Sequence, residues 1–149
     1  MLALFADSAQ FELQGMGVLL QSRNDIRELL EYGVVVQSRL KLREVEVMGD
    51  TASCRLEERN EWFKLLGVEP VYYRCRVAVN RGRISLIRIK LEPGSQDALS
   101  GRLAEFMLWS MAKDPQAAAG LLPGGRFAYT AGTARALIAQ LRLWRSGSR

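Results

Sequence analysis

Polar and apolar residues alternate along the middle of the chain with the period of two that is typical of β-strands. This alternation predicts four long strands, at Leu40–Met48, Thr51–Phe63, Val71–Asn80 and Ile84–Glu92. Gly49-Asp50 and Arg81-Gly82 supply turn residues between neighbouring strands. A shorter strand is expected at Gln10–Gln14, where Phe11 and Leu13 share one face. Together these segments predict a strongly curved, mostly antiparallel sheet.

Apolar residues spaced three and four apart predict helices on both sides of this strand region. Ser22 and Asp25 have the spacing of a capping box, which opens a helix at about Arg23–Val35. Asp114 and Pro115 form a cap and first-turn pair for a later helix. The C-terminal helices are expected at about Gln96–Lys113, Pro115–Leu121 and Gly132–Trp144. The expected fold class is therefore α+β, with helices laid against the sheet.

The length of 149 residues fits one domain, which we expect to have a core of sheet and helix in 1–93 and a helical segment in 94–149. Apolar residues at 48% and charged residues at 25% are ordinary for a soluble globular protein. No apolar run approaches the roughly 20 residues of a membrane span, and no basic region precedes the apolar start. We therefore expect a cytoplasmic protein that contacts no membrane.

The net charge of +5 belongs to one segment, because Gln116 to Arg149 contains five arginines and no acid. These arginines are spread along a helix and a tail without the clustered aromatic residues of a nucleic-acid interface, so nucleic acid is not an expected partner. The chain has no histidine, which removes the usual zinc sets and the histidine-dependent nucleophile pairs. Cys54 and Cys75 are expected to be small buried hydrophobic residues. We expect no metal and no cofactor.

The strand Thr51–Phe63 has two contrasting faces. One face is charged and carries Arg55, Glu57, Arg59 and Glu61. The other carries Cys54, Leu56, Glu58, Asn60 and Trp62. Glu58 and Asn60 are thus polar residues on an otherwise apolar face, and Tyr73, Cys75 and Ser85 lie on the corresponding faces of the next two strands.

A carboxyl on an apolar face loses solvation, which suits Glu58 to proton transfer near neutral pH and makes it the candidate catalytic residue. Asn60 could hold a water or a substrate oxygen, and Tyr73 could donate a hydrogen bond. The candidate ligand contacts are therefore Asn60, Trp62, Tyr73, Cys75 and Ser85. The alternative for Glu58 and Asn60 is a hydrogen-bonded structural pair, or a Glu58 bridged to an arginine, and for the aromatic and cysteine residues it is core packing.

Three stretches carry a resemblance to a known family: FADSAQFELQG followed by SRNDIRELLEY, then CRLEERNEWFKLLG, then VYYRCRVAVNRGRISLIRIKLEP. In element order and turn placement they resemble the nuclear transport factor 2-like (NTF2-like) superfamily, which includes the SnoaL-like proteins. The resemblance covers about residues 2–93. It implies a cone-shaped sheet (a cystatin-like roll) with helices on its concave side and a hydrophobic pocket inside.

The chemistries of such families transfer poorly to these residues. Ketosteroid isomerases take a proton with an aspartate, but Leu13 stands where that base would be. Limonene epoxide hydrolase-like enzymes use an acid-Arg-acid set, and Glu92 lies roughly where they place an acid, although its strand phase puts it on the outer face. The expected function is binding of a small, largely apolar molecule. The alternatives are a hydrolase or isomerase with Glu58 as general base, and a structural protein whose cone is filled by its own side chains.

Family members usually begin with helices that close the cone, and this chain begins after the place where those helices would end. The segment AAGLLPGGRFAYTAGTARALIAQL echoes LALFADSAQFELQG…NDIRELL, and we hypothesise that Gln96–Leu121 supplies the lid of its own cone or of a partner's. A homodimer is expected through the outer sheet face. That face carries charges of mixed sign at Glu57, Glu61, Arg74, Arg76, Arg88 and Lys90.

Overall fold

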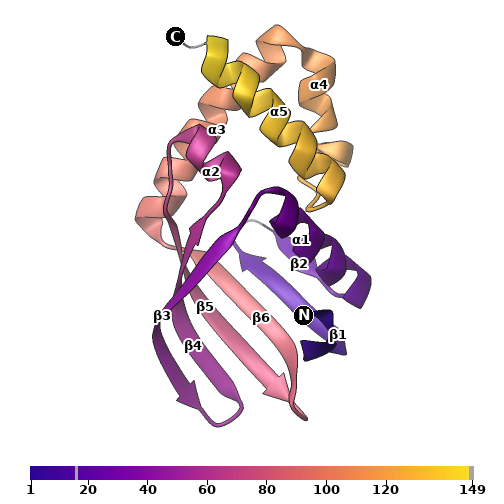
Figure 1. Cartoon of the computed structure of the whole chain (residues 1–149), viewed down its shortest axis with the longest axis vertical. Helices are drawn as coiled ribbons and strands as arrows, with labels where there is room; N and C mark the ends of the chain where they lie inside the picture. Colours follow the sequence, from indigo (N-terminus) through magenta and orange to yellow (C-terminus); the bar gives the residue numbers. More distant parts are fainter. Residues whose placement is uncertain (16, 148–149) are drawn as a thin grey trace.

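The computed structural model describes residues 1–15 and 17–147 (Figure 1). Its strands are β1 (Phe5–Gln14), β2 (Val18–Leu20), β3 (Arg39–Met48), β4 (Thr51–Arg59), β5 (Val71–Asn80) and β6 (Arg83–Leu91). Its α-helices are α1 (Arg23–Val35), α2 (Glu61–Leu66), α3 (Pro93–Lys113), α4 (Pro115–Gly120) and α5 (Ala131–Gly147). Short 3-10 turns lie at Leu2–Leu4 and Pro123–Gly125.

The strands form one sheet in the order β2-β1-β6-β5-β4-β3. β1 pairs with β6 in parallel, and the other neighbours pair antiparallel. In Figure 1 the β3–β4 and β5–β6 hairpins extend away from α3, α4 and α5, which gather at the opposite end of the molecule. This arrangement confirms the predicted α+β class and the curved, mostly antiparallel sheet.

Most elements have the predicted bounds, but the predicted strand Thr51–Phe63 is wrong beyond Arg59. Asn60 ends the strand because its side-chain oxygen accepts a hydrogen bond from the Phe63 backbone N–H at 2.8 Å, which caps α2. Gly67 then ends α2 with φ 77°, a left-handed conformation that favours glycine. Trp62, predicted on a strand, therefore lies on a helix. β1 also begins five residues earlier than the predicted strand, and β2 was not predicted.

The core lies between the concave face of the sheet and the helices. The sheet contributes buried Leu13, Leu56, Val71, Tyr73 and Leu91. α5 contributes buried Leu137, Leu141 and Trp144, and it packs on α1 and α2. The helix that covers α1 and α2 thus follows the segment Gln96–Leu121 that we hypothesised as a lid. Within residues 1–15 and 17–147, no helix is both long and apolar enough to cross a membrane.

Candidate functional site

Glu58 is the centre of a hydrogen-bonded cluster at the end of β4. Ser38, just before β3, donates its hydroxyl to Glu58 Oε1 at 2.7 Å. The Asn60 side-chain amide donates to the same oxygen at 3.0 Å. Tyr73 on β5 donates its hydroxyl to Glu58 Oε2 at 3.0 Å. Three donors from three segments therefore hold this half-buried carboxylate in place.

Two further tyrosines extend the cluster toward the helices. Tyr32 on α1 and Tyr129, two residues before α5, have ring centroids 5.2 Å apart with their planes at 68°. Phe127 makes edge contacts with both, at 6.0 Å and 5.1 Å. These rings enclose the polar end of the cone in apolar surface, since edge-to-face packing is a favourable arrangement of aromatic side chains.

Burial and the charge of Glu58 both raise the pKa values of the three tyrosine hydroxyls. Burial, first, and the Glu58 carboxylate raise the pKa of Tyr73 well above its ordinary value. Burial, the neighbouring Tyr129 and Glu58 do the same to the pKa of Tyr32. The pKa of Tyr129 rises to about 12 for the same two main reasons, burial and then Glu58. All three phenols are therefore protonated donors near neutral pH.

One of these three hydroxyls is buried and donates to no acceptor among the described residues. Tyr32 Oη is buried and has no hydrogen-bond partner among the described residues, and the same holds for Trp62 Nε1. Buried polar groups in proteins are normally hydrogen-bonded, so an orphaned hydroxyl next to the rings of Phe127 and Tyr129 requires an explanation.

Of the residues predicted for the site, the structure brings Glu58, Asn60 and Tyr73 together. Asn60 uses both ends of its amide, one on Glu58 and one on the α2 cap, which is the structural pair that the sequence left as an alternative. Trp62 packs against the neighbouring Phe63, with ring centroids 4.3 Å apart.

The other two predicted residues lie further along the sheet. Cys75 is buried and lies opposite Cys54 in the β4–β5 register. Ser85 lies near the β5–β6 turn at an irregularity of register, where its hydroxyl donates to the Ala78 carbonyl at 3.2 Å. Val71 lies opposite Glu58, and Ala78 is seven residues further along β5. Since strands rise about 3.3 Å per residue, Ser85 lies about 23 Å along the strand from Glu58.

Sequence reasoning missed Ser38, Tyr32 and Tyr129. Tyr32 falls three residues after Leu29 on a helix whose bounds were predicted, so its helical position was a usable signal. Ser38 and Tyr129 lie in connecting segments with no period, and only the packed structure brings them to Glu58.

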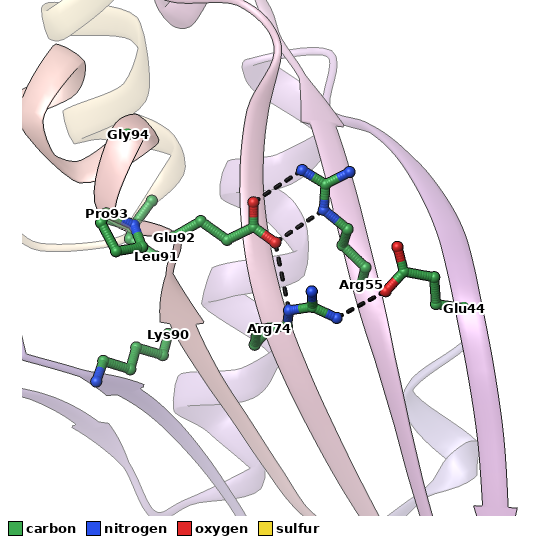
Figure 2. Close-up of a pocket in the computed structure, with 8 residues that line it drawn as sticks. All are labelled: Glu44, Arg55, Arg74, Lys90, Leu91, Glu92, Pro93 and Gly94. Carbon is green, nitrogen blue, oxygen red and sulfur yellow. Dashed lines mark hydrogen bonds and ion pairs between the residues drawn. The ribbon is translucent and has the colours of Figure 1, made fainter.

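A cleft lies on the other face of the sheet (Figure 2). It has a volume of about 480 Å³ and is lined by Glu44, Arg55, Arg74, Lys90, Leu91, Glu92, Pro93 and Gly94. Arg55 donates to both Glu92 oxygens at 2.8 Å, and Arg74 contacts Glu92 at 3.4 Å and Glu44 at 2.7 Å. The hydrogen bond from Arg55 is the main cause that lowers the pKa of Glu92. Glu92 is thus on the outer face, as predicted, in an ion-pair network closed within the chain.

A smaller cleft of about 180 Å³ borders the Glu58 cluster through Asn60. Its lining is polar and consists of Gln37, Arg39, Arg59, Asn60, Glu61, Lys64 and Glu69. Neither cleft is lined by Glu58 or Tyr73, so the hydrophobic pocket inside the cone stays a prediction. Among the described residues, no group of three or more cysteine and acidic residues is arranged to hold a metal ion.

No protein-family model and no curated protein matches this sequence. Several solved structures are similar to the structure of this chain. SalBIII, described as an epoxide hydrolase/cyclase-like enzyme in pyran ring formation in polyether salinomycin, is 12% identical over 63% of this chain and 77% of its own, with a TM-score of 0.54. A LEH-like epoxide hydrolase of M. tuberculosis is 18% identical over 74% of this chain and 79% of its own, with a TM-score of 0.50.

An NTF2-like protein of unknown function from Cytophaga hutchinsonii is 6% identical over 62% of this chain and 72% of its own, also with a TM-score of 0.50. At these identities the likeness concerns the fold. The predicted NTF2-like fold is confirmed.

Proposed function

We propose that this chain, whose fold is NTF2-like, binds a small and largely apolar molecule between the concave sheet face and the helices α1 and α5. The observation that carries the proposal is the buried, unpartnered hydroxyl of Tyr32. Leaving such a donor unsatisfied costs about 1–3 kcal/mol, and an oxygen or nitrogen of a bound molecule would remove that cost.

The surroundings of Tyr32 suggest the character of the ligand. Phe127 and Tyr129 present ring faces and edges, which favour an apolar or aromatic body. The Glu58 cluster lies close enough to influence the tyrosine hydroxyls through its charge, so a ligand with one hydroxyl or carbonyl group would suit the polar end. Binding pockets commonly combine apolar walls with a few such polar groups.

A hydrolase or isomerase with Glu58 as general base is the second candidate. Its support is the carboxylate itself, next to the hydroxyl of Tyr73, in a fold that two proteins described as epoxide hydrolase-like share. We place it second because Ser38, Asn60 and Tyr73 already donate to the carboxylate. A carboxylate accepts about four hydrogen bonds, so about three of its acceptor sites are occupied within the chain before any substrate binds.

Native mass spectrometry of the purified protein tests the binding proposal. We expect a discrete small molecule to remain with the wild type and to be reduced in Tyr32→Phe, which lacks the hydroxyl that the ligand would satisfy. Tyr72→Phe is the matched control, because Tyr72 lies on the outer face beneath Arg55, and it should retain the wild-type amount.

The same experiment separates the alternatives. If no molecule is retained and Tyr32→Phe melts at a higher temperature than the wild type, the cone is filled by its own side chains and the binding proposal is wrong. If wild type and Glu58→Gln retain molecules that differ by a chemical transformation, such as the addition of one water, the enzyme candidate replaces simple binding.

A further inference from the structure

The end strand β3 is exposed along its whole length. It lies at one edge of the sheet, and each of its ten residues is exposed to solvent. The exposed residues include a row of large apolar side chains, Leu40 at 61%, Leu42 at 61%, Val45 at 54% and Val47 at 70%. An edge strand with unpaired backbone groups and apolar side chains is a template for pairing with another strand.

A bulge keeps this apolar row on one face. Leu40 and Leu42 lie opposite Glu58 and Leu56, on the concave side of β4. The register shifts between Arg43 and Glu46, where Glu44 has a φ of 52°. The extra residue reverses the alternation, so Val47 lies opposite Ala52 on the same concave side as Leu40. Without the bulge, the two halves of the row would point to opposite faces.

The charged residues of β3 are divided by sign at the same point. The first half carries Arg39, Lys41 and Arg43, and the second half carries Glu44 and Glu46. A strand with this pattern is complementary to a second copy of itself that runs antiparallel to it. An antiparallel copy centred on the bulge sets Arg43 against Glu44, Lys41 against Glu46, Leu42 against Val45 and Leu40 against Val47.

We propose that β3 pairs with β3 of a second copy of this chain, antiparallel and in this register, which joins two sheets across a twofold axis. Opposite charges directly across a strand pair stabilise it, and like charges destabilise it. Charges and bulges also protect edge strands from wrong partners, and in this register no two like charges lie opposite each other. The contact is the same patch on both copies and therefore closes at a dimer.

The outer sheet face, where the sequence led us to expect the dimer, is less suited to it. Its carboxylates are already paired within the chain. Glu57 lies between Arg43 and Arg59, with N–O distances of 3.1 and 3.2 Å, and Glu12 accepts from Arg88 at 2.7 Å. A partner at this face would have to replace pairs that the monomer already makes. At the edge, Arg43 and Glu44 also have partners within the chain, Glu57 and Arg74. The structure gives neither Lys41 nor Glu46 an ion pair among the described residues, so these two residues carry the proposed contact.

Sedimentation velocity at micromolar protein tests the register by charge reversal. We expect a wild-type dimer, and a weakening of its dissociation constant of about tenfold or more in Lys41→Glu and in Glu46→Lys, because each change makes two symmetry-related pairs repulsive. An equimolar mixture of the two variants should dimerise again, since one copy then carries only acids and the other only bases at these positions. The double variant K41E/E46K should also restore the dimer.

Arg83→Glu is the matched control, an exposed strand residue outside β3, and it should leave the dimer unchanged. A wild type that is monomeric at high concentration would overturn the proposal. A dimer that survives both single reversals would place the contact elsewhere. Single variants that are monomeric and folded by circular dichroism, but do not dimerise when mixed, would overturn the register.

Discussion

Cys54 and Cys75 lie opposite each other on neighbouring strands, and both pack in the core. Burial, and then the neighbouring Cys54, raise the pKa of the Cys75 thiol to about 12. Because the thiolate is the reactive form, we expect Cys75 to react slowly with thiol reagents.

The rates at which Cys54 and Cys75 react are measurable by alkylation with iodoacetamide at pH 8. With a pKa of about 12, only about one Cys75 in ten thousand is a thiolate at that pH, so we expect the more exposed Cys54 to react well before it. Peptide mass spectrometry over time gives the two rates. Denaturant should remove the difference, and equal rates in the folded protein would contradict the burial of Cys75.

The polar contacts of Glu58 were predictable only in part. Strand alternation places Glu58 and Tyr73 on the concave faces of paired strands, so their contact follows from the period of two. The hydrogen bond from Ser38, and the position of Tyr129 near enough to be influenced by the charge of Glu58, depend on how connecting segments pack, and no local pattern encodes that. Asn60 was assigned to the correct neighbourhood for the wrong reason, because its capping of α2 was not recognised.

At the scale of elements, α5 stabilises the helical layer by packing on α1 and α2. Helical period predicted its buried stripe, including Leu137, Leu141 and Trp144, since burial repeats every three to four residues. The same pattern could not predict which elements this stripe contacts, because helices of similar amphipathicity have interchangeable faces. The hypothesis that Gln96–Leu121 supplies a lid came instead from the sequence echo between the two ends of the chain, and it stays a prediction.

Two neighbouring leucines test the packing of α5. Leu141 is fully buried, so Leu141→Ala should lower the free energy of unfolding by about 2–5 kcal/mol through the cavity it leaves. Leu143 is 57% exposed, so Leu143→Ala on the same helix should change it by no more than about 0.5 kcal/mol. Urea unfolding followed by circular dichroism measures both. Similar losses would mean that α5 packs with a different face.

At the scale of the whole molecule, the sheet combines strand pairs that are consecutive in the sequence with one pair, β1 and β6, that is far apart in the sequence. β3, β4, β5 and β6 follow one another as antiparallel neighbours, and their turns were predicted from Gly49-Asp50 and Arg81-Gly82. The element order also gave the family resemblance, and hence the fold. No sequence pattern predicted which strand would lie at the edge, because alternation of polar and apolar residues describes the two faces of a strand and not its two hydrogen-bonding edges.

The parallel pairing of β1 with β6 has a consequence for how the molecule forms. Leu13 lies beside Ile89, so β1 can pair with β6 only after β3, β4 and β5 have been synthesised. Contacts so far apart in sequence bear the entropy of closing a large loop, and they form late when local hairpins are available first. We therefore expect β1 to dock onto a sheet of β3 to β6 that has already folded.

Stopped-flow kinetics can test this order. Leu13→Ala on β1 should chiefly speed unfolding, whereas Leu56→Ala in the hairpin region should chiefly slow folding, because only interactions present in the transition state affect the folding rate. A Leu13→Ala variant that folds more slowly than Leu56→Ala would reverse the order. If the order holds, β1 stays unpaired until β6 has been synthesised, and an unpaired strand in that interval is prone to pairing with wrong partners.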